Sequence, residues 1–346
     1  MILITGGHCG KDKWPSCSQL YDITHNRSAL VPPSFRLTSR SGMASAVANH
    51  RVYVTGGQDA NELVSSDMQV FDAIANQSTL GTPMRIPRAW HSMVSYQHKL
   101  MVCGGWNAEE KFLISCENYA MRDMRWTILE HMMEAPRCHH AGVMFGKHML
   151  LIGGANYESI ALKSVAAADL SSCVKFSWLR VKPLRVARVA PVAAVHGFVA
   201  YVCGGYSFQG PLRDCEYLTR IDDEWKHLTT LTSVGGPRFG SWMVAYRNQL
   251  VIGGGRNYEK KSPKQGAERN QSVRTVELYN INLNYSHVLE LPLAEPCYYC
   301  TAVVLPTMKR AARYAGHGPN QALRCFTPYS TYLLFTFSYS VKIMLS

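Results

Sequence analysis

Short apolar runs recur at a regular interval along most of this chain. Six of them read MILIT, VYVT, LMVC, MLLI, YVC and LVIG. Continuous apolar runs of this length are typical of strands that are buried on both faces. Each run leads into a pair of glycines, and the pairs begin at residues 6, 56, 104, 153, 204 and 254. The chain is therefore expected to contain six strand-rich units, spaced 48 to 51 residues apart.

An arginine lies 16 residues before the first glycine in five of the six units, and the first unit lacks this upstream half. The five are Arg40, Arg88, Arg137, Arg188 and Arg238. Between arginine and glycines the sequence reads as two apolar strands joined by a short polar turn. A single four-stranded sheet cannot bury both of its faces, so such units stack against one another. A period near 50 residues with four short strands per unit predicts a β-propeller.

The repeat resembles the kelch motif. Besides the glycines and arginines in phase, most units have a strand that ends in an aromatic or acidic pair, such as Tyr21-Asp22. Three units then carry a tryptophan, namely Trp126, Trp178 and Trp225. The resemblance covers residues 1–305. It implies an all-β fold, a six-bladed kelch β-propeller of four-stranded antiparallel blades, followed by a C-terminal extension.

The two ends of the repeat region are expected to pair. Residues 1–7 look like the second strand of a blade whose first strand is missing. Residues 296–305 have the first-strand pattern and overlay on residues 136–145, with Cys297 at the position of Arg137 and Tyr299 at that of His139. Pairing of 1–7 with 296–305 would close the ring, and closure removes the exposed edges of an open sheet.

Two segments depart from the repeat. Arg256 to Ser272 is polar and charged and is expected to be an exposed loop of the last blade. Residues 306–346 are predicted to be an irregular basic and aromatic tail. Within it, Cys325 to Val341 is free of charge, but it is too short and too polar for a spanning helix. The sequence leaves open an added strand pair, a surface segment, a disordered tail or an altered reading frame. No membrane partner is expected.

The net charge of +12 changes this picture little. The tail supplies five basic residues and no acids, so the propeller itself is only moderately basic. No basic helix, zinc-finger spacing or aromatic stripe accompanies the charge, so no nucleic-acid partner is expected. A moderately basic face fits acidic peptides better.

Cysteine usage points to a reducing compartment. The eleven cysteines are scattered, their number is odd, and no signal peptide precedes the first strand. Cys103 and Cys203 lie inside buried strands, where they are expected to behave as small apolar side chains. A cytoplasmic location follows, with the cytoskeleton as a possibility.

No metal or cofactor is expected. Cys297 and Cys300 form a lone CxxC, and a structural zinc site needs further ligands. His139 and His140 are adjacent on an expected strand, so they should point to opposite faces. The sequence contains no GxSxG, HExxH or Walker pattern, and neither sialidase-type boxes nor the histidines of a copper oxidase. We expect a non-catalytic protein-binding module, with a copper or glycosidic enzyme as the alternative from another class.

The repeats look like the C-terminal propellers of BTB-kelch (kelch-like) proteins. This resemblance implies substrate recognition for a cullin-RING ubiquitin ligase, and the alternative is an actin-binding, cytoskeletal role. No BTB or BACK region precedes the repeats here. The chain is therefore expected to be either a fragment of a longer adaptor or a free-standing binding module.

The resemblance also implies where a peptide would sit. It would touch residues just after the glycine pairs and residues two past the motif arginine. The first set is His8, Gln58, Trp106, Ala155, Tyr206 and Arg256, with Asn107 and Asn257 beside them; the second set is Gly42, Trp90, His139, Ala190 and Gly240. Since aromatic and arginine anchors dominate binding hot spots, we predict protein contacts for Trp90, Trp106, Asn107, His139, Tyr206, Arg256, Asn257, Gln58 and His8. The alternative is that each packs on its neighbouring loop.

Overall fold

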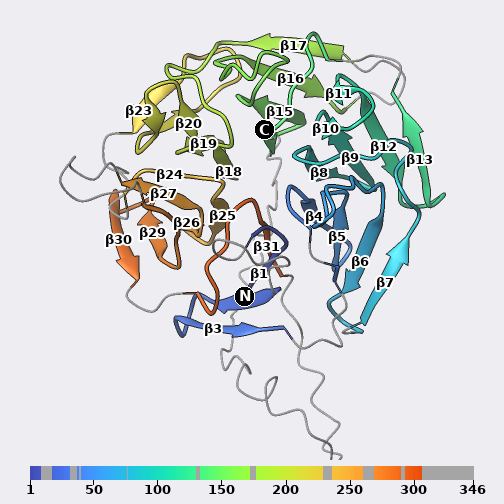
Figure 1. The fold of residues 1–346 in the computed structure, drawn as a ribbon. Helices are drawn as coiled ribbons and strands as arrows, with labels where there is room; N and C mark the ends of the chain where they lie inside the picture. The colour runs from blue at the N-terminus through green and yellow to red at the C-terminus, as the bar shows by residue number, and fades with distance from the viewer. Residues whose placement is uncertain are drawn as a thin grey trace, which may run out of the picture. The chain divides into compact units, whose positions relative to one another are not determined.

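Six four-stranded antiparallel sheets make up most of the described chain in this computed structural model (Figure 1). The structure describes residues 1–8, 18–31, 37–38, 40–75, 77–129, 133–171, 177–228, 236–259, 269–289 and 293–305. All regular structure in these ranges is β, and none of it is a helix that could cross a membrane. The all-β, six-bladed architecture expected from the repeat is confirmed.

Each blade runs from an innermost strand outward to a fourth strand at the rim. Blade 1 contains β31 (Thr301–Val304), β1 (Ile2–Thr5), β2 (Gln19–Asp22) and β3 (Arg27–Leu30). Blade 2 contains β4 (Ala44–Ala48), β5 (Arg51–Thr55), β6 (Met68–Asp72) and β7 (Gln77–Gly81). Blade 3 contains β8 (Ser92–Tyr96), β9 (Lys99–Cys103), β12 (Cys116–Ala120) and β13 (Arg125–Ile128).

The second half of the chain repeats this order. Blade 4 contains β14 (Ala141–Phe145), β15 (His148–Ile152), β16 (Val165–Asp169) and β17 (Ser177–Val181). Blade 5 contains β18 (Val192–His196), β19 (Val199–Cys203), β22 (Cys215–Leu218) and β23 (Lys226–Leu228). Blade 6 contains β25 (Trp242–Tyr246), β26 (Gln249–Gly253), β29 (Val276–Asn280) and β30 (Tyr285–Leu289).

Short ribbons lie in three of the loops that follow the glycine pairs. They are formed by β10 (Trp106–Asn107) with β11 (Lys111–Phe112), by β20 (Tyr206–Ser207) with β21 (Gly210–Pro211), and by β24 (Arg238–Phe239), β27 (Arg256–Glu259) and β28 (Arg269–Ser272). The segment Arg256 to Ser272 was expected to be an exposed loop between the second and third strands of the last blade, and its two ends pair as β27 and β28. Residues 260–268 lie outside the described residues. These strands pair through backbone hydrogen bonds, which the polarity of the side chains does not predict.

The two ends of the repeat region meet in blade 1. β31 pairs antiparallel with β1, with Ile2 opposite Val304 and Thr5 opposite Thr301. The blue β1 and the orange-red β31 lie side by side in Figure 1. The innermost strands contact one another in the order β31, β4, β8, β14, β18, β25 and back to β31.

The chain divides into two units, Met1–Ala311 and Ala312–Ser346. The propeller boundary at residue 305 stays a prediction. The tail predicted for residues 306–346 lies outside the described residues.

Hydrophobic clusters fill the interfaces between neighbouring blades. Each of six clusters combines buried side chains of two adjacent blades. In one of them Leu150 and Ile152 of blade 4 join Ala200 and Val202 of blade 5. Every blade thus buries both faces against its neighbours, which explains why the second strands are apolar throughout.

The glycine pair of one blade contacts the arginine that precedes the next blade. The second glycine donates its N–H to the carbonyl of the next arginine, as Gly57 does to Arg88 at 2.9 Å. A Cβ on Gly56 would lie 2.2 Å from the same carbonyl oxygen, and the φ of Gly56 is 65°. Only glycine permits this approach and this backbone conformation. The constant spacing of arginine and glycines therefore reflects packing between blades.

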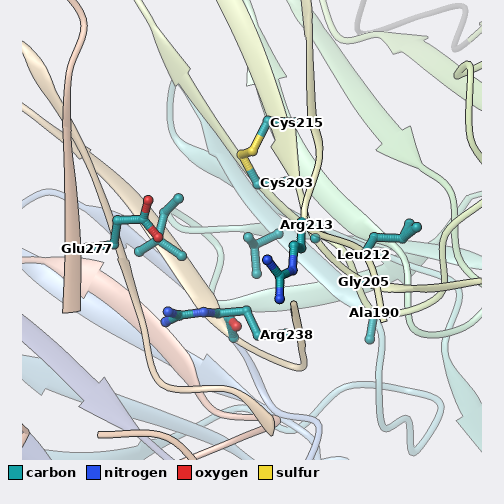
Figure 2. Close-up of a pocket in the computed structure, with 12 residues that line it drawn as sticks. Ala190, Cys203, Gly205, Leu212, Arg213, Cys215, Arg238 and Glu277 are labelled. Carbon is teal, nitrogen blue, oxygen red and sulfur yellow. A yellow bond between two sulfur atoms is a disulfide. The ribbon is translucent and has the colours of Figure 1, made fainter. Parts of the chain in front are cut away.

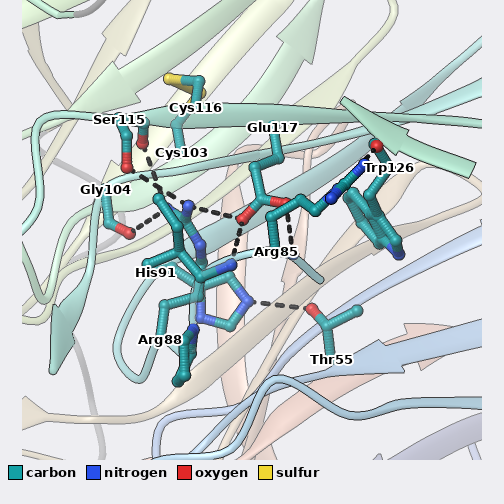
Figure 3. A network of polar contacts seen from close by, with 12 residues as sticks. Thr55, Arg85, Arg88, His91, Cys103, Gly104, Ser115, Cys116, Glu117 and Trp126 are labelled. Carbon is teal, nitrogen blue, oxygen red and sulfur yellow. Dashed lines mark hydrogen bonds and ion pairs between the residues drawn. A yellow bond between two sulfur atoms is a disulfide. The ribbon is translucent and has the colours of Figure 1, made fainter. Parts of the chain in front are cut away.

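Buried ion pairs anchor the arginine side chains (Figure 3). Arg88 donates from Nη2 to Glu117 Oε1 at 2.8 Å, and both side chains are fully buried. Its Nη1 donates to the carbonyls of Gly104 and Ser115. The Glu117 carboxylate also accepts the backbone N–H groups of Arg85 and Ile86, at 2.7 and 3.1 Å. One carboxylate therefore ties a guanidinium and a connecting loop to the blade.

The same arrangement varies around the ring. Arg188 pairs with Glu216 at 2.6 Å. In blade 1 Cys297 replaces the arginine and Gln19 replaces the glutamate. The Gln19 side chain donates to the Cys297 sulfur at 3.7 Å. In blade 4 only one partner changes, because Ala166 stands where Glu117 stands in blade 3.

Arg137 of blade 4 is consequently a buried cation without a carboxylate partner in the described ranges. Among the residues that the structure describes, it donates to the carbonyls of Leu151, Gly153 and Ser164 and to the Ser164 hydroxyl. Burial lowers the pKa of Arg137 to about 10, against the opposing effect of Glu134. This blade therefore lacks a charge compensation that blades 3 and 5 have.

We expect Ala166→Glu to stabilise the protein by about 1–2 kcal/mol, because it restores a hydrogen bond between charged groups. The measurement is urea unfolding of the variant and the parent chain. Ala166→Gln is the matched control, since it adds the volume without the charge. Equal or lower stability of the glutamate variant relative to the glutamine variant would contradict the expectation.

Two disulfides bridge the second and third strands of blades 3 and 5. Cys103 bonds to Cys116 and Cys203 to Cys215, and the Cα atoms are 4.2 Å apart in both. The expectation that Cys103 and Cys203 act as small apolar side chains is therefore wrong. The sequence did not reveal the cross-strand register that places a second cysteine opposite each of them. The argument for a reducing compartment loses this support, and the cytoplasmic location stays a prediction.

Candidate functional site

A closed ring of backbone hydrogen bonds surrounds the propeller axis at the end where the glycine pairs lie. Each blade contributes one residue, and each N–H donates to the carbonyl of the preceding member at 2.7–3.4 Å. We call these six residues the mouth ring: Gly42, Trp90, His139, Ala190, Gly240 and Tyr299. Tyr299 closes the ring, because it accepts from Gly42 and donates to Gly240.

The backbone of the mouth ring is left-handed at every position, with φ between 50° and 67°. Glycine takes this conformation freely, whereas a bulky residue there is uncommon. Trp90, His139 and Tyr299 nevertheless occupy it. Their rings use the space that smaller members leave, since a Cβ on Gly42 would lie 2.6 Å from the Trp90 ring. Such backbone strain is concentrated at binding and active sites, so it marks this ring as a candidate site.

Aromatic rings cross the mouth ring in one chain of contacts. Successive centroid distances are 5.9 Å for Trp106 and Trp90, 4.8 Å for Trp90 and His139, and 5.3 Å for His139 and Tyr299. The chain continues through Phe239 at 6.2 Å to Tyr206 at 5.6 Å.

A side branch leaves this chain at Tyr299. It runs to Tyr298 at 5.3 Å and from there to His8 at 4.9 Å, and the Arg256 guanidinium lies 5.0 Å from the Tyr298 centroid. We call the eight rings and Arg256 the aromatic surface. It links loops of blades 1, 3, 4, 5 and 6 across the axis.

Six of the nine predicted contact residues belong to this aromatic surface, namely His8, Trp90, Trp106, His139, Tyr206 and Arg256. Asn107 does not, because it is 3% exposed and its side chain bonds to Pro87 and Glu110 of nearby loops. Gln58 donates to the Glu62 carbonyl within its own loop. Asn257 lies against Gly236.

Tyr298, Tyr299 and Phe239 were not among the predicted contact residues. The overlay of 296–305 on 136–145 contained a signal for Tyr299, since it placed this residue on His139. Phe239 directly precedes Gly240 of the mouth ring, a position that carries small or apolar residues in most other blades. Phe239 contacts both Tyr206 and Tyr299 because the blades curve around the axis, and the sequence alone does not predict this contact.

The centre of the aromatic surface is uncharged at neutral pH. Burial lowers the pKa of His139 to about 4. Burial and the charge of Arg256 lower the pKa of His8. Cations lie at two edges, where Arg256 covers Tyr298 and the Lys111 ammonium lies 5.9 Å from the Trp106 centroid. This arrangement can bind apolar or aromatic groups and supplies cation–π contacts at the edges.

His139 and His140 differ from the expectation. They do not lie on a strand, because His139 has a φ of 51° in the turn before β14. His139 faces the aromatic surface, whereas His140 is buried, 7% exposed, with Nε2 2.9 Å from the Ser92 hydroxyl. The left-handed turn, rather than strand alternation, separates the two side chains.

A small cavity lies between blades 5 and 6, beside the Cys203–Cys215 disulfide (Figure 2). Arg213, Arg238 and Glu277 line it, but its volume is only about 10 Å³. That space suits a single water molecule. It is therefore too small for a ligand larger than water.

Known proteins share the repeat across most of this propeller. The family profile described as "KLHDC2/KLHL20/DRC7 Kelch-repeats domain" matches residues 90–284, more than half of the chain, and the Kelch motif matches residues 39–85. Alpha-scruin of Limulus polyphemus is 29% identical over 284 residues, which are 77% of this chain and 29% of that protein. Kelch-like protein 25 of Rattus norvegicus is 25% identical over 268 residues, 73% of this chain and 42% of that protein.

A solved structure described as "Structure of YjhT" superposes with a TM-score of 0.64 at 14% identity, over 76% of this chain and 86% of that one. This likeness shows the fold alone. The chain spans less than half the length of these two curated relatives. The matched profiles, the arginines and glycines in phase and the six blades agree, and the chain belongs to the kelch-repeat family of β-propellers, a family of protein-interaction modules.

Proposed function

We propose that this chain binds a segment of a partner protein on the aromatic surface. The observation that carries the proposal is the unbroken contact chain of rings across the mouth ring, three of them on strained backbone. Blade packing does not need these rings, since the hydrophobic clusters between blades already bury the strands. Tyr206 remains 42% exposed at one end of the chain. Aromatic anchors with an arginine at the edge are the side chains that dominate binding hot spots.

The finer proposal is that the chain recognises substrates for a cullin-RING ubiquitin ligase. It is supported by similarity to kelch-like proteins and to "Kelch repeat and BTB domain-containing protein 1" of cowpox virus, which is 23% identical over 69% of this chain and 42% of that protein. The alternative, an actin-binding role, predicts cosedimentation with filaments.

Trp106→Ala/Tyr206→Ala/Arg256→Ala is expected to lose the partner. Each side chain is an anchor at a different edge of the aromatic surface, and anchors of this kind typically contribute about 2 kcal/mol or more each. The measurement is affinity capture from lysate, followed by titration of the captured protein, with at least about a hundredfold weaker binding expected for the triple variant.

The control is Ile74→Ala/Phe198→Ala/Leu283→Ala. These side chains are 72%, 88% and 73% exposed, and all lie in turns at the opposite ends of the strands. The control should keep the partner. Equal capture by all three proteins, with circular dichroism showing both variants folded, would mean that the aromatic surface does not bind. A ubiquitin-ligase role further requires that a cullin is captured with the full-length protein.

A further inference from the structure

Three neighbouring blades carry acidic loop tips at the mouth of the propeller. The tips are residues 58–64 of blade 2, 106–112 of blade 3 and 155–161 of blade 4, and each directly follows a glycine pair. We call these three tips the acidic arc. Their net charge is −4, whereas the net charge of the whole chain is +12. The charged residues of the arc are Asp59, Glu62, Glu109, Glu110, Lys111 and Glu158.

Side-chain hydrogen bonds fold each tip of the acidic arc. In blade 2 the Asp59 carboxylate accepts the backbone N–H groups two and four residues later, both at 2.9 Å. In blade 4 Asn156 Oδ1 does the same at 3.1 and 3.0 Å. In blade 3 Asn107 Oδ1 accepts the N–H of Glu110 at 2.7 Å. Turns of this kind are local, and they leave the glutamates of all three tips exposed.

The acids of the arc form no ion pair with another described residue. Most other acidic side chains in the described ranges pair with a cation, as Asp67 does with Arg40 at 2.6 Å. The ammonium of Lys111 lies 5.9 Å from the centroid of the Trp106 ring. The negative charge of the arc is therefore largely uncompensated, and it attracts cationic groups of a partner.

Each tip also carries an apolar side chain that is at least partly exposed. Leu63 is 65% exposed in blade 2, and Ile160 is 52% exposed in blade 4. In blade 3 Phe112 lies opposite Trp106 in the ribbon of β10 with β11, and its ring contacts that of Tyr157 at a centroid distance of 5.6 Å. Side chains that lie opposite each other in an antiparallel pair are neighbours. The aromatic surface therefore extends from Trp106 to the loop tip of blade 4.

Basic side chains lie in the loops of blades 5 and 6, across the axis. The ribbon of β10 with β11 and the ribbon of β24 with β27 are on opposite sides of the ring (Figure 1). The blade 5 loop, residues 206–213, has no acid and ends in the exposed Arg213. In blade 6 the Arg256 guanidinium covers the Tyr298 ring. An acidic arc and a cationic edge thus lie on opposite sides of the aromatic surface.

Other occupants fit the acidic arc less well. The phosphates of nucleic acids and of anionic lipids would be repelled by its net charge. Across the described ranges, no three His, Cys, Asp or Glu side chains are grouped as a metal site requires. A polypeptide can instead present cationic and apolar side chains together, which matches the glutamates and the apolar residues of each tip.

We propose that the acidic arc binds lysine or arginine side chains of the partner segment whose apolar side chains occupy the aromatic surface. This inference rests on the proposed function and specifies the chemistry of the partner. The partner segment is basic and apolar. The net charge of the chain favoured an acidic peptide, but the charge of these three loop tips has the opposite sign.

The test selects random twelve-residue peptides, displayed on phage, against the immobilised full chain. Selected peptides are synthesised and titrated by fluorescence anisotropy against the parent chain and three variants. Glu62→Lys/Glu109→Lys/Glu158→Lys reverses the charge of the arc. Asp123→Lys/Asp222→Lys/Glu224→Lys is the matched control, because it adds the same charge in exposed turns at the opposite ends of the strands. Trp106→Ala/Tyr206→Ala/Arg256→Ala reports on the aromatic surface.

We expect lysine and arginine to outnumber aspartate and glutamate in the selected peptides, together with aromatic or aliphatic residues. The charge-reversed variant should bind them about tenfold more weakly, which is the loss of three exposed ion pairs, and the matched control should stay within about threefold of the parent. If the charge-reversed variant fails to fold by circular dichroism, Glu62→Gln/Glu109→Gln/Glu158→Gln replaces it, with about threefold weaker binding expected.

Selected peptides without an excess of basic residues, or with equal affinity for the parent and the charge-reversed variant, would overturn the inference. The alanine variant then separates the two proposals. If it loses these peptides, the aromatic surface binds a partner without help from the acidic arc, and the proposed function stands. If it keeps them, or if no peptide is selected, both proposals fail.

Discussion

Glu117→Ala is expected to lower the free energy of unfolding by about 3–5 kcal/mol, the loss typical when one partner of a buried ion pair is removed. The Arg88 guanidinium would remain fully buried, with the carbonyls of Gly104 and Ser115 and the Ser115 hydroxyl as its uncharged acceptors. The backbone N–H groups of Arg85 and Ile86 would lose their acceptor as well. Urea unfolding followed by tryptophan fluorescence and circular dichroism measures the loss.

Two controls separate this effect from a general cost of substitution. Glu117→Gln keeps an acceptor for the loop and should fall between the parent chain and the alanine variant. Glu224→Ala removes an exposed contact of 4.0 Å with Lys182 and should cost less than about 1 kcal/mol. If Glu117→Ala and Glu224→Ala were equally mild, the buried pair would not hold the loop to the blade.

Truncation after residue 295 is expected to abolish cooperative folding, whereas truncation after residue 305 should preserve it. The first truncation removes β31, which supplies the innermost strand of blade 1 and the buried Val303 and Leu305. It also removes Tyr299 and opens the mouth ring. Since a domain is typically stable by about 5–15 kcal/mol, an unpaired β1 and two open blade interfaces are enough to unfold it.

Thermal unfolding of both truncated chains and the full chain measures this difference. The chain ending at residue 305 is the matched control, because it lacks the whole predicted tail and keeps β31. A melting temperature for the shorter chain that equals that of the control would show that the ring does not depend on β31. Failure of both chains would instead place the propeller boundary beyond residue 305.

The architecture was predictable because every blade has the same local structural requirement, and this requirement produces the sequence repeat. Glycine is needed where a Cβ would meet the carbonyl of the next arginine in five units, and that of Cys297 in the sixth. The ribbon of β27 with β28 and the two disulfides were not readable in the same way. They depend on which residues come to face each other across strands, and no periodic pattern marks those pairs.

The candidate site was predictable only in part, for a related reason. Motif positions pointed to Trp90, Trp106, His139 and Tyr206, since large rings at loop positions are visible in the sequence. Their contact with one another, and with Tyr299, requires the ring to be closed. Asn107 is the opposite case. Its motif position predicted a protein contact, but its side chain bonds to Pro87 and Glu110 within the propeller.

The amino-acid sequence by itself determined the blade count, the buried second strands and the joint between glycines and arginines. These features need only contacts within a blade or with the next one, and the repeat carries them. The tertiary structure alone decided the closed hydrogen-bond ring, the left-handed backbone of Trp90, His139 and Tyr299, and the contacts of their rings across the axis. These features arise where all six blades converge on one axis, so no single blade or neighbouring pair of blades contains them.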